Sequence, residues 1–126
     1  MSAELPSVIQ EYLQAYTARD VDSLIATLTD DVVFENLSNQ AAPTRTEGRA
    51  AFEALARQSV LVFSSRRQSV VEAVVGADCV ALFIDYEATV LADLPNGWKA
   101  GQQIRLRGSS FFHLRNGRIA QVVDFS

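Results

Sequence analysis

Apolar residues recur at every second position through the last third of the chain, in three segments separated by turn residues. These segments are 79–91, 102–114 and 118–126. A period of two over this length predicts strands that hold one face against a core. The pair Asn116-Gly117, between the last two segments, is typical of a tight hairpin turn. The pattern therefore predicts a curved antiparallel sheet at the C-terminal end.

The first half of the chain carries the pattern of helices. In residues 5–16 the apolar side chains recur every three or four positions, which predicts an amphipathic helix. Asp20 is suited to cap a second helix, whose apolar stripe extends to Leu28. Residues 48–59 again place apolar and charged side chains on opposite faces. Three helices are therefore expected before the main part of the sheet.

Two shorter strands and a loop complete the predicted elements. Residues 32–37 and 68–75 have the composition of strands, whereas residues 38–45 are rich in Ser, Asn, Ala and Pro and predict a loop. The order is helix, helix, strand, helix, then four strands. This order predicts a single α+β domain over residues 1–126, with three helices packed on a bent antiparallel sheet.

Alternate positions of each predicted strand share one face, called here their parity, and two polar residues interrupt the face that is otherwise apolar. Ser110 shares its parity with Phe112, and Asp124 shares its parity with Val122. Polar groups on an inner face mark a candidate site, because burying them is costly. Burial would raise the pKa of Asp124 toward values that suit a general acid or base. The alternative is that the strand frays near its end and leaves this carboxylate hydrated.

Composition narrows the classes of partner. The chain has 11 basic and 15 acidic residues and no run of Lys or Arg, so nucleic acid is not an expected partner. One Cys and one His exclude a zinc site of the Cys/His type, and no metal is expected. No stretch approaches the roughly 20 apolar residues of a membrane span. We expect no membrane association, and a cytoplasmic protein.

Four local strings occur in an order that resembles the nuclear transport factor two superfamily, in particular its SnoaL-like (polyketide cyclase) and steroid delta-isomerase-like branches. They are ARDVDSL at 18–24, LTDDVVF at 28–34, EGRAAF at 47–52 and FHLRNGRI at 112–119. The resemblance covers essentially the whole chain. It implies a cone-shaped, cystatin-like α+β fold and a cofactor-free site. This fold hosts isomerases, cyclases, dehydratases, epoxide hydrolases and binding modules without catalysis, so fold alone does not give activity.

The resemblance also assigns expected roles to single residues. Tyr12 falls at the position of the isomerase tyrosine that donates a hydrogen bond to a developing oxyanion. Asn36 stands at the position of the isomerase base, and Ser110 at that of the second oxyanion donor. Asp124 matches the aspartate of SnoaL-like cyclases, whose histidine is again replaced by Ser110. His113 is predicted to lie on the opposite face of its strand and cannot replace that histidine.

These residues define a predicted pocket for a mostly apolar small molecule. Asp124 and Tyr12 are the expected catalytic residues, and Asn36 and Ser110 are expected to position substrate or water. The remaining predicted substrate contacts are Tyr16, Leu28, Phe34, Leu55, Tyr86, Trp98, Phe112 and Val122. The expected activity is acid/base chemistry of the isomerase, cyclase or lyase type. The alternatives are a ligand-binding module without catalysis and a dimerisation module.

The other parity of the strands predicts a charged outer face. Asp85 and Glu87 are expected there, paired with Arg105 and Arg107, and the pair Arg66-Arg67 is expected on the same face. Two aromatic residues, Phe83 and Phe111, share this parity, and their exposure would be costly. We therefore expect a homodimer that packs through the convex face of the sheet, as is common in the family it resembles.

Overall fold

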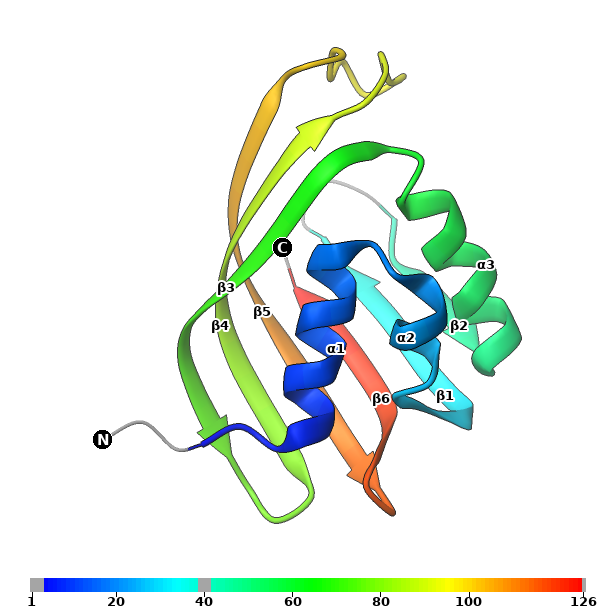
Figure 1. Cartoon of the computed structure of the whole chain (residues 1–126), viewed down its shortest axis with the longest axis vertical. Helices are drawn as coiled ribbons and strands as arrows, with labels where there is room; N and C mark the ends of the chain where they lie inside the picture. Colours follow the sequence, from blue (N-terminus) through cyan, green and yellow to red (C-terminus); the bar gives the residue numbers. More distant parts are fainter. Residues whose placement is uncertain (1–3, 39–41, 126) are drawn as a thin grey trace.

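The computed structural model describes residues 4–38 and 42–125, which form a curved sheet around a small group of helices (Figure 1). In chain order the elements are α1 (Ser7–Ala18), α2 (Val21–Ile25), β1 (Leu28–Leu37), β2 (Thr44–Glu47), α3 (Arg49–Ser59), β3 (Phe63–Val75), β4 (Cys79–Val90), β5 (Gln103–Arg115) and β6 (Arg118–Phe125). The predicted α+β cone is confirmed.

The six strands form one sheet in the order β2-β1-β6-β5-β4-β3. Neighbouring strands run antiparallel except for β1 and β6, which run parallel. The sheet is therefore mixed, and the prediction of a purely antiparallel sheet is wrong at this pair. The reason is the long path from β1 through β2, α3 and three further strands, after which the β5–β6 hairpin brings β6 back beside β1 in the same direction.

The helices lie within the concave side of the sheet, as Figure 1 shows. Helix α1 packs against β3 and β6, and α3 packs against β1 and β2. The inward stripe of α1 buries Ile9, Tyr12 and Ala15, as the sequence period predicts. The Asp20 side chain accepts a hydrogen bond from the Ser23 backbone N–H at 3.2 Å, which confirms the predicted cap of α2.

Several boundaries differ from the predicted ones. Helix α2 ends at Ile25, and Leu28 begins β1 instead of extending the helix, because its backbone pairs with β6 at Ile119. Strand β2 overlaps the end of the segment predicted as loop 38–45 and extends two residues beyond it, and residues 39–41 of that segment lie outside the described residues. Strand β3 begins at Phe63, five residues earlier than predicted, because it follows β4 along its whole length.

The core is built from side chains of the helices and of the concave face of the sheet. Its largest fully buried side chains are Phe112, Ile9, Leu28, Ile119, Val32, Val80, Val90 and Val122. The predicted hairpin at Asn116-Gly117 is present, and both residues have positive φ (53° and 76°), as a type I′ turn requires. Among the described residues, no helix has the length and hydropathy needed to span a membrane. The cytoplasmic location stays a prediction.

Candidate active site

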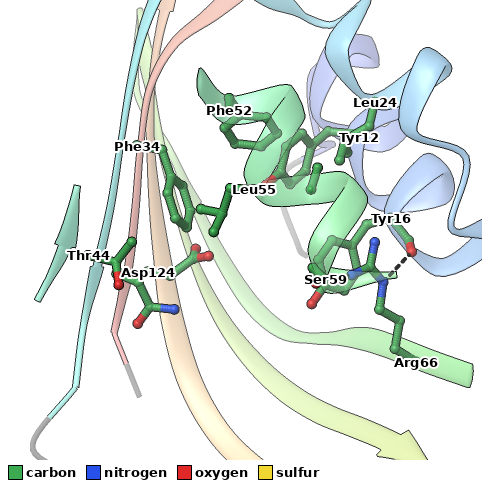
Figure 2. A pocket seen from close by; sticks show the side chains of 12 residues that line it. Tyr12, Tyr16, Leu24, Phe34, Thr44, Phe52, Leu55, Ser59, Arg66 and Asp124 are labelled. Atoms are coloured by element: carbon green, nitrogen blue, oxygen red, sulfur yellow. Dashed lines mark hydrogen bonds between the residues drawn. The ribbon is translucent and has the colours of Figure 1, made fainter. Parts of the chain in front are cut away.

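Two adjoining cavities lie between the helices and the concave face of the sheet. The first has a volume of about 210 Å³ and the second of about 330 Å³. Both are lined by Tyr16, Asn36, Ser59 and Asp124, so they form two chambers of one pocket. Figure 2 shows the first chamber, with the Asp124 carboxylate on one wall and Arg66 and Tyr16 on the opposite wall. The pocket therefore reaches the residue that the strand parity singled out.

Asp124 lies near the end of β6, beside Ser110 of β5 in the sheet register. Ser110 is 5% exposed, and its hydroxyl donates a hydrogen bond to Asp124 Oδ1 at 2.6 Å. Desolvation raises the pKa of Asp124 to about 6, although the Ser110 hydrogen bond opposes this shift. The predicted increase in pKa is present, and the carboxyl group can both accept and return a proton near neutral pH.

Tyr12 projects from α1 into the first chamber and is only 3% exposed. Burial raises the pKa of its phenol, and the charge of Asp124 raises it further, whereas the charge of Arg66 lowers it. Phe112 packs edge-on against the ring, with centroids 5.3 Å apart. Tyr12 therefore stays protonated at neutral pH and is available as a hydrogen-bond donor.

Aromatic side chains form much of the second chamber. Tyr16 donates a hydrogen bond from its hydroxyl to the Tyr86 hydroxyl at 3.2 Å, and burial raises the pKa of both phenols. Phe63 packs against Tyr86 and against Trp98, each with a centroid separation of 6.2 Å. Trp98 thus lies at the pocket, as the sequence predicts, and continues the aromatic wall into the loop between β4 and β5.

Arg66 is the main residue of the pocket that sequence reasoning missed. It was expected on the outer face, but its side chain is 4% exposed and lines the first chamber. Its Nε donates to the Tyr16 carbonyl oxygen at 2.9 Å, and Nη1 donates to Ser59 Oγ at 2.7 Å (Figure 2). The guanidinium carbon also lies 3.8 Å from the centroid of the Tyr16 ring.

A β-bulge in β3 turns Arg66 inward. Near the turn that joins β3 to β4, Ala73 pairs with Leu82. Beyond a register shift between Val70 and Glu72, the pairing of β3 with β4 moves by one residue. Arg66 then lies opposite Ala88, whose side chain faces the core. Without the shift, its neighbour Arg67 would take that place. Because one extra residue exchanges the two faces of a strand, alternation along the sequence alone does not identify the inward arginine.

Most of the predicted site residues line the pocket. The first chamber contains Tyr12, Tyr16, Phe34, Asn36, Leu55 and Asp124, and the second contains Tyr86, Trp98 and Ser110. Three predicted contacts line neither chamber: Leu28, Phe112 and Val122 have exposures of 0%, 1% and 0% and belong to the packed core. They do face the inside of the sheet, as predicted, but they lie where side chains pack against one another and leave no cavity. Residues that the sequence did not single out include Thr44, Phe52, Ser59, Phe63 and Gln68.

The outer face carries the predicted charge pairs. Asp85 Oδ1 lies 2.9 Å from Arg107 Nε, and Glu87 Oε1 lies 3.8 Å from Arg105 Nε. His113 is half exposed and lies 3.7 Å from Asp78, away from the pocket, as its parity predicts. Over residues 4–38 and 42–125, no group of three His, Cys, Asp or Glu side chains is placed to hold a metal ion.

The fold and the pocket together define a small α+β cone with an acidic residue inside a partly aromatic cavity. The model of the SnoaL-like domain family matches residues 9–122, which is most of the chain. The chain belongs to this family, and the predicted relationship is confirmed. No curated protein matches it.

Solved structures with the same fold include two candidate polyketide cyclases. The one from Xanthomonas campestris pv. campestris is 28% identical with a TM-score of 0.73, over 95% of this chain and 87% of that one. The one from Pseudomonas putida KT2440 is 26% identical with a TM-score of 0.75, over 100% and 92%. A protein of ketosteroid isomerase-like fold from Catenulispora acidiphila, in complex with trimethylamine, is 13% identical with a TM-score of 0.81, over 98% and 87%.

Proposed function

We propose that this protein is an enzyme that uses Asp124 as a general acid and base on a mostly apolar small molecule. The observation that carries this proposal is the Asp124 carboxyl group inside the pocket, with a pKa of about 6 caused by desolvation. A base whose pKa lies near the working pH transfers protons efficiently in both directions. The proposed reaction is of the isomerase, cyclase or lyase type, in which a proton is removed from one atom and returned to another.

Tyr12 is the proposed donor to an oxyanion that develops in the reaction. Its phenol is kept protonated by burial and by the charge of Asp124, and it lines the same chamber as that carboxyl group. A preorganised donor in a site of low dielectric stabilises developing negative charge more than water does. Asn36, which pairs with Asp124 in the parallel register of β1 and β6, is proposed to position substrate or water together with Ser110.

The proposed substrate has an apolar body with few polar groups. Phe34, Phe52 and Leu55 line the first chamber, and Phe63, Tyr86 and Trp98 line the second. Other proteins of this fold support a small-molecule site. One was co-crystallised with polyporic acid, one is described as a hydroxylase and one as an epoxide hydrolase-like protein. Their range of activities leaves the reaction type of this chain as part of the proposal.

The test is exchange of carbon-bound hydrogen in deuterated water, followed by mass spectrometry on a panel of cyclic ketones and hydroxyaryl ketones. Asp124→Asn removes the base with little change of volume, and we expect the exchange rate to fall by at least about 100-fold. Asp85→Asn, an identical change on the outer face, is the matched control and is expected to leave the rate unchanged. Exchange that persists in a folded Asp124→Asn variant would remove Asp124 from the mechanism.

The second candidate is a ligand-binding module without catalysis. It is favoured by the neutral residues Asn36 and Ser110, which occupy positions where related isomerases and cyclases are expected to carry ionisable groups. In that case panel compounds bind in the pocket, and Asp124→Asn changes their affinity while no compound is exchanged or converted. The same experiment therefore separates the two functions.

We also propose that two copies associate through the convex face of the sheet. Phe83 and Phe125 are 43% and 46% exposed there. Phe111 points to the same face of the sheet, because it lies two residues from Ser109, which pairs with Phe83. Exposed aromatic side chains in one region favour association. Light scattering after gel filtration is expected to give twice the chain mass, and Phe83→Ser is expected to shift it toward the monomer. A monomer at high concentration would contradict the dimer.

A further inference from the structure

The buried Arg66 has no acidic partner in the part of the chain that the structure describes. Its side chain is 4% exposed, and no carboxylate of residues 4–38 and 42–125 lies within 4.0 Å of its nitrogens. Two exposed arginines of the same chain, Arg57 and Arg107, do contact carboxylates. A buried charge without a counter-ion is unfavourable. The pocket therefore holds a cation whose charge the protein does not neutralise.

The known contacts of Arg66 use only part of its hydrogen-bonding capacity. A guanidinium group has five N–H donors in a planar fork. Two of them serve neutral acceptors, namely the Tyr16 carbonyl oxygen and Ser59 Oγ, while the Tyr16 ring covers one face. These contacts hold the group against one wall of the first chamber, across from Asp124 (Figure 2). The remaining donors are those of Nη2 and the second hydrogen of Nη1.

Arg66 is not needed to connect α1 to β3, because another arginine already connects these two elements. Arg19 follows the last turn of α1 and donates from Nη1 to the Phe63 carbonyl oxygen at 2.8 Å and to that of Val60 at 3.4 Å. It joins the end of α1 to the start of β3 from the solvent side, where a charge costs little. Connecting these elements therefore does not require a second, buried cation inside the pocket.

We propose that Arg66 binds an anionic oxygen of the substrate, as a carboxylate or an ionised phenol or enol, at the end of the first chamber opposite Asp124. The planar fork of arginine suits two-point contact with such groups. The apolar body of the substrate would lie between the two ends, against Phe34 and Leu55. This inference names the substrate class for the site described under Proposed function and rests on that function.

The test compares two probes of the same shape, 2-naphthoate and its neutral amide 2-naphthamide, by titration calorimetry at pH 7. The wild type is expected to bind naphthoate at least tenfold more tightly than the amide. Arg66→Met is expected to weaken naphthoate binding at least tenfold and amide binding less than threefold. Arg67→Gln, on the opposite face of the same strand, and Arg19→Gln are the matched controls and are expected to change neither affinity.

Three results would overturn the inference: a wild type that does not bind naphthoate, a wild type without preference for the anion, or a folded Arg66→Met variant that loses both probes equally. If Arg66→Met does not fold, Arg66→Lys keeps the charge but not the fork, and is expected to weaken naphthoate binding three- to tenfold with the amide unchanged. An unchanged naphthoate affinity in that variant also overturns it. Binding is measured without turnover, so failure here leaves the exchange test of Asp124 intact.

Discussion

The two faces of the sheet place similar charged groups in opposite circumstances. On the convex face Asp85 and Arg107 are register partners on β4 and β5, their side chains are 46% and 66% exposed, and they contact each other at 2.9 Å. On the concave face Arg66 is buried and Asp124 is partly buried, and each is bonded to neutral partners instead of to the other. The outer pair is exposed and neutralised, whereas the inner groups are shielded from solvent and have no charged partner.

This contrast shows which charged groups lower the stability of the folded protein. An exposed ion pair contributes between about 0 and 1 kcal/mol and needs no functional explanation. An enclosed carboxyl group without a cation partner loses hydration, and its raised pKa records that loss. Unpaired inner charges are therefore the features that a substrate site explains best, and the predictions below alter one face while its counterpart on the other face serves as control.

The largest expected effect separates the filled core from the outer surface. Phe112→Ala removes a side chain that is 1% exposed and is expected to lower the free energy of unfolding by about 3–5 kcal/mol. Phe83→Ala, on the adjacent strand but 43% exposed, is expected to cost about 1 kcal/mol or less. Urea unfolding at low protein concentration measures both. Equal losses in the free energy of unfolding would mean that the concave face of the sheet does not form the packed core.

The next effect is the pH dependence of stability that Asp124 produces. Its pKa in the folded protein is raised to about 6, so folding favours the protonated carboxyl group, and stability falls as pH rises from about 4 through 6. We expect the wild type to lose up to about 3 kcal/mol relative to Asp124→Asn between pH 4 and pH 8. Unfolding curves at several pH values measure this difference, and parallel curves for the two proteins would contradict it.

A smaller effect concerns the hydrogen bond between Ser110 and Asp124. Ser110→Ala removes a donor that stabilises the ionised carboxylate, so the pKa of Asp124 is expected to rise by about one further unit. The pH at which the stability loss levels off should move upward by the same amount. Ser65→Ala, at an exposed position of β3 that lines neither chamber, is the control and should leave that pH where it is.

The smallest effect is expected on the outer face. Asp85→Asn breaks an exposed ion pair and should change the free energy of unfolding by less than about 1 kcal/mol, and by still less in 0.5 M salt, which screens exposed charges. A loss comparable with that of Phe112→Ala would show that the two faces are not as different as their exposure indicates. Urea unfolding with and without added salt measures it.

The sequence predicted the C-terminal half of the fold and its inner parity well. The Asn116-Gly117 turn marks the hairpin of β5 and β6, and alternation within each strand places Ser110 and Asp124 on the inner face. A register shift between His113 and Leu114, which the sequence does not reveal, then sets the two residues directly opposite each other. The parallel partner of β6 was not predictable, because alternation says which face a residue occupies but not which strand lies beside it. Strand β2, four mostly exposed residues at the edge of the sheet, has no apolar pattern to reveal it.

The pocket was predicted less completely than the fold. Leu28, Phe112 and Val122 have the inner parity but lie where side chains pack against one another and leave no cavity, and parity does not report position along a strand. Arg66 was missed because the bulge between Val70 and Glu72 exchanges the faces of β3, and no residue there signals a bulge in the way that glycine or proline would.

The central claim is that the Asp124 carboxyl group is desolvated inside the pocket and titrates near neutral pH. The most direct measurement is an NMR titration of the ¹³C side-chain carboxyl signals, with Asp124 assigned by its absence in Asp124→Asn. A pKa of about 6 is expected for that signal. A value near 4, like that of a hydrated aspartate, would contradict it and would remove the acid/base role that the proposed function assigns to this residue.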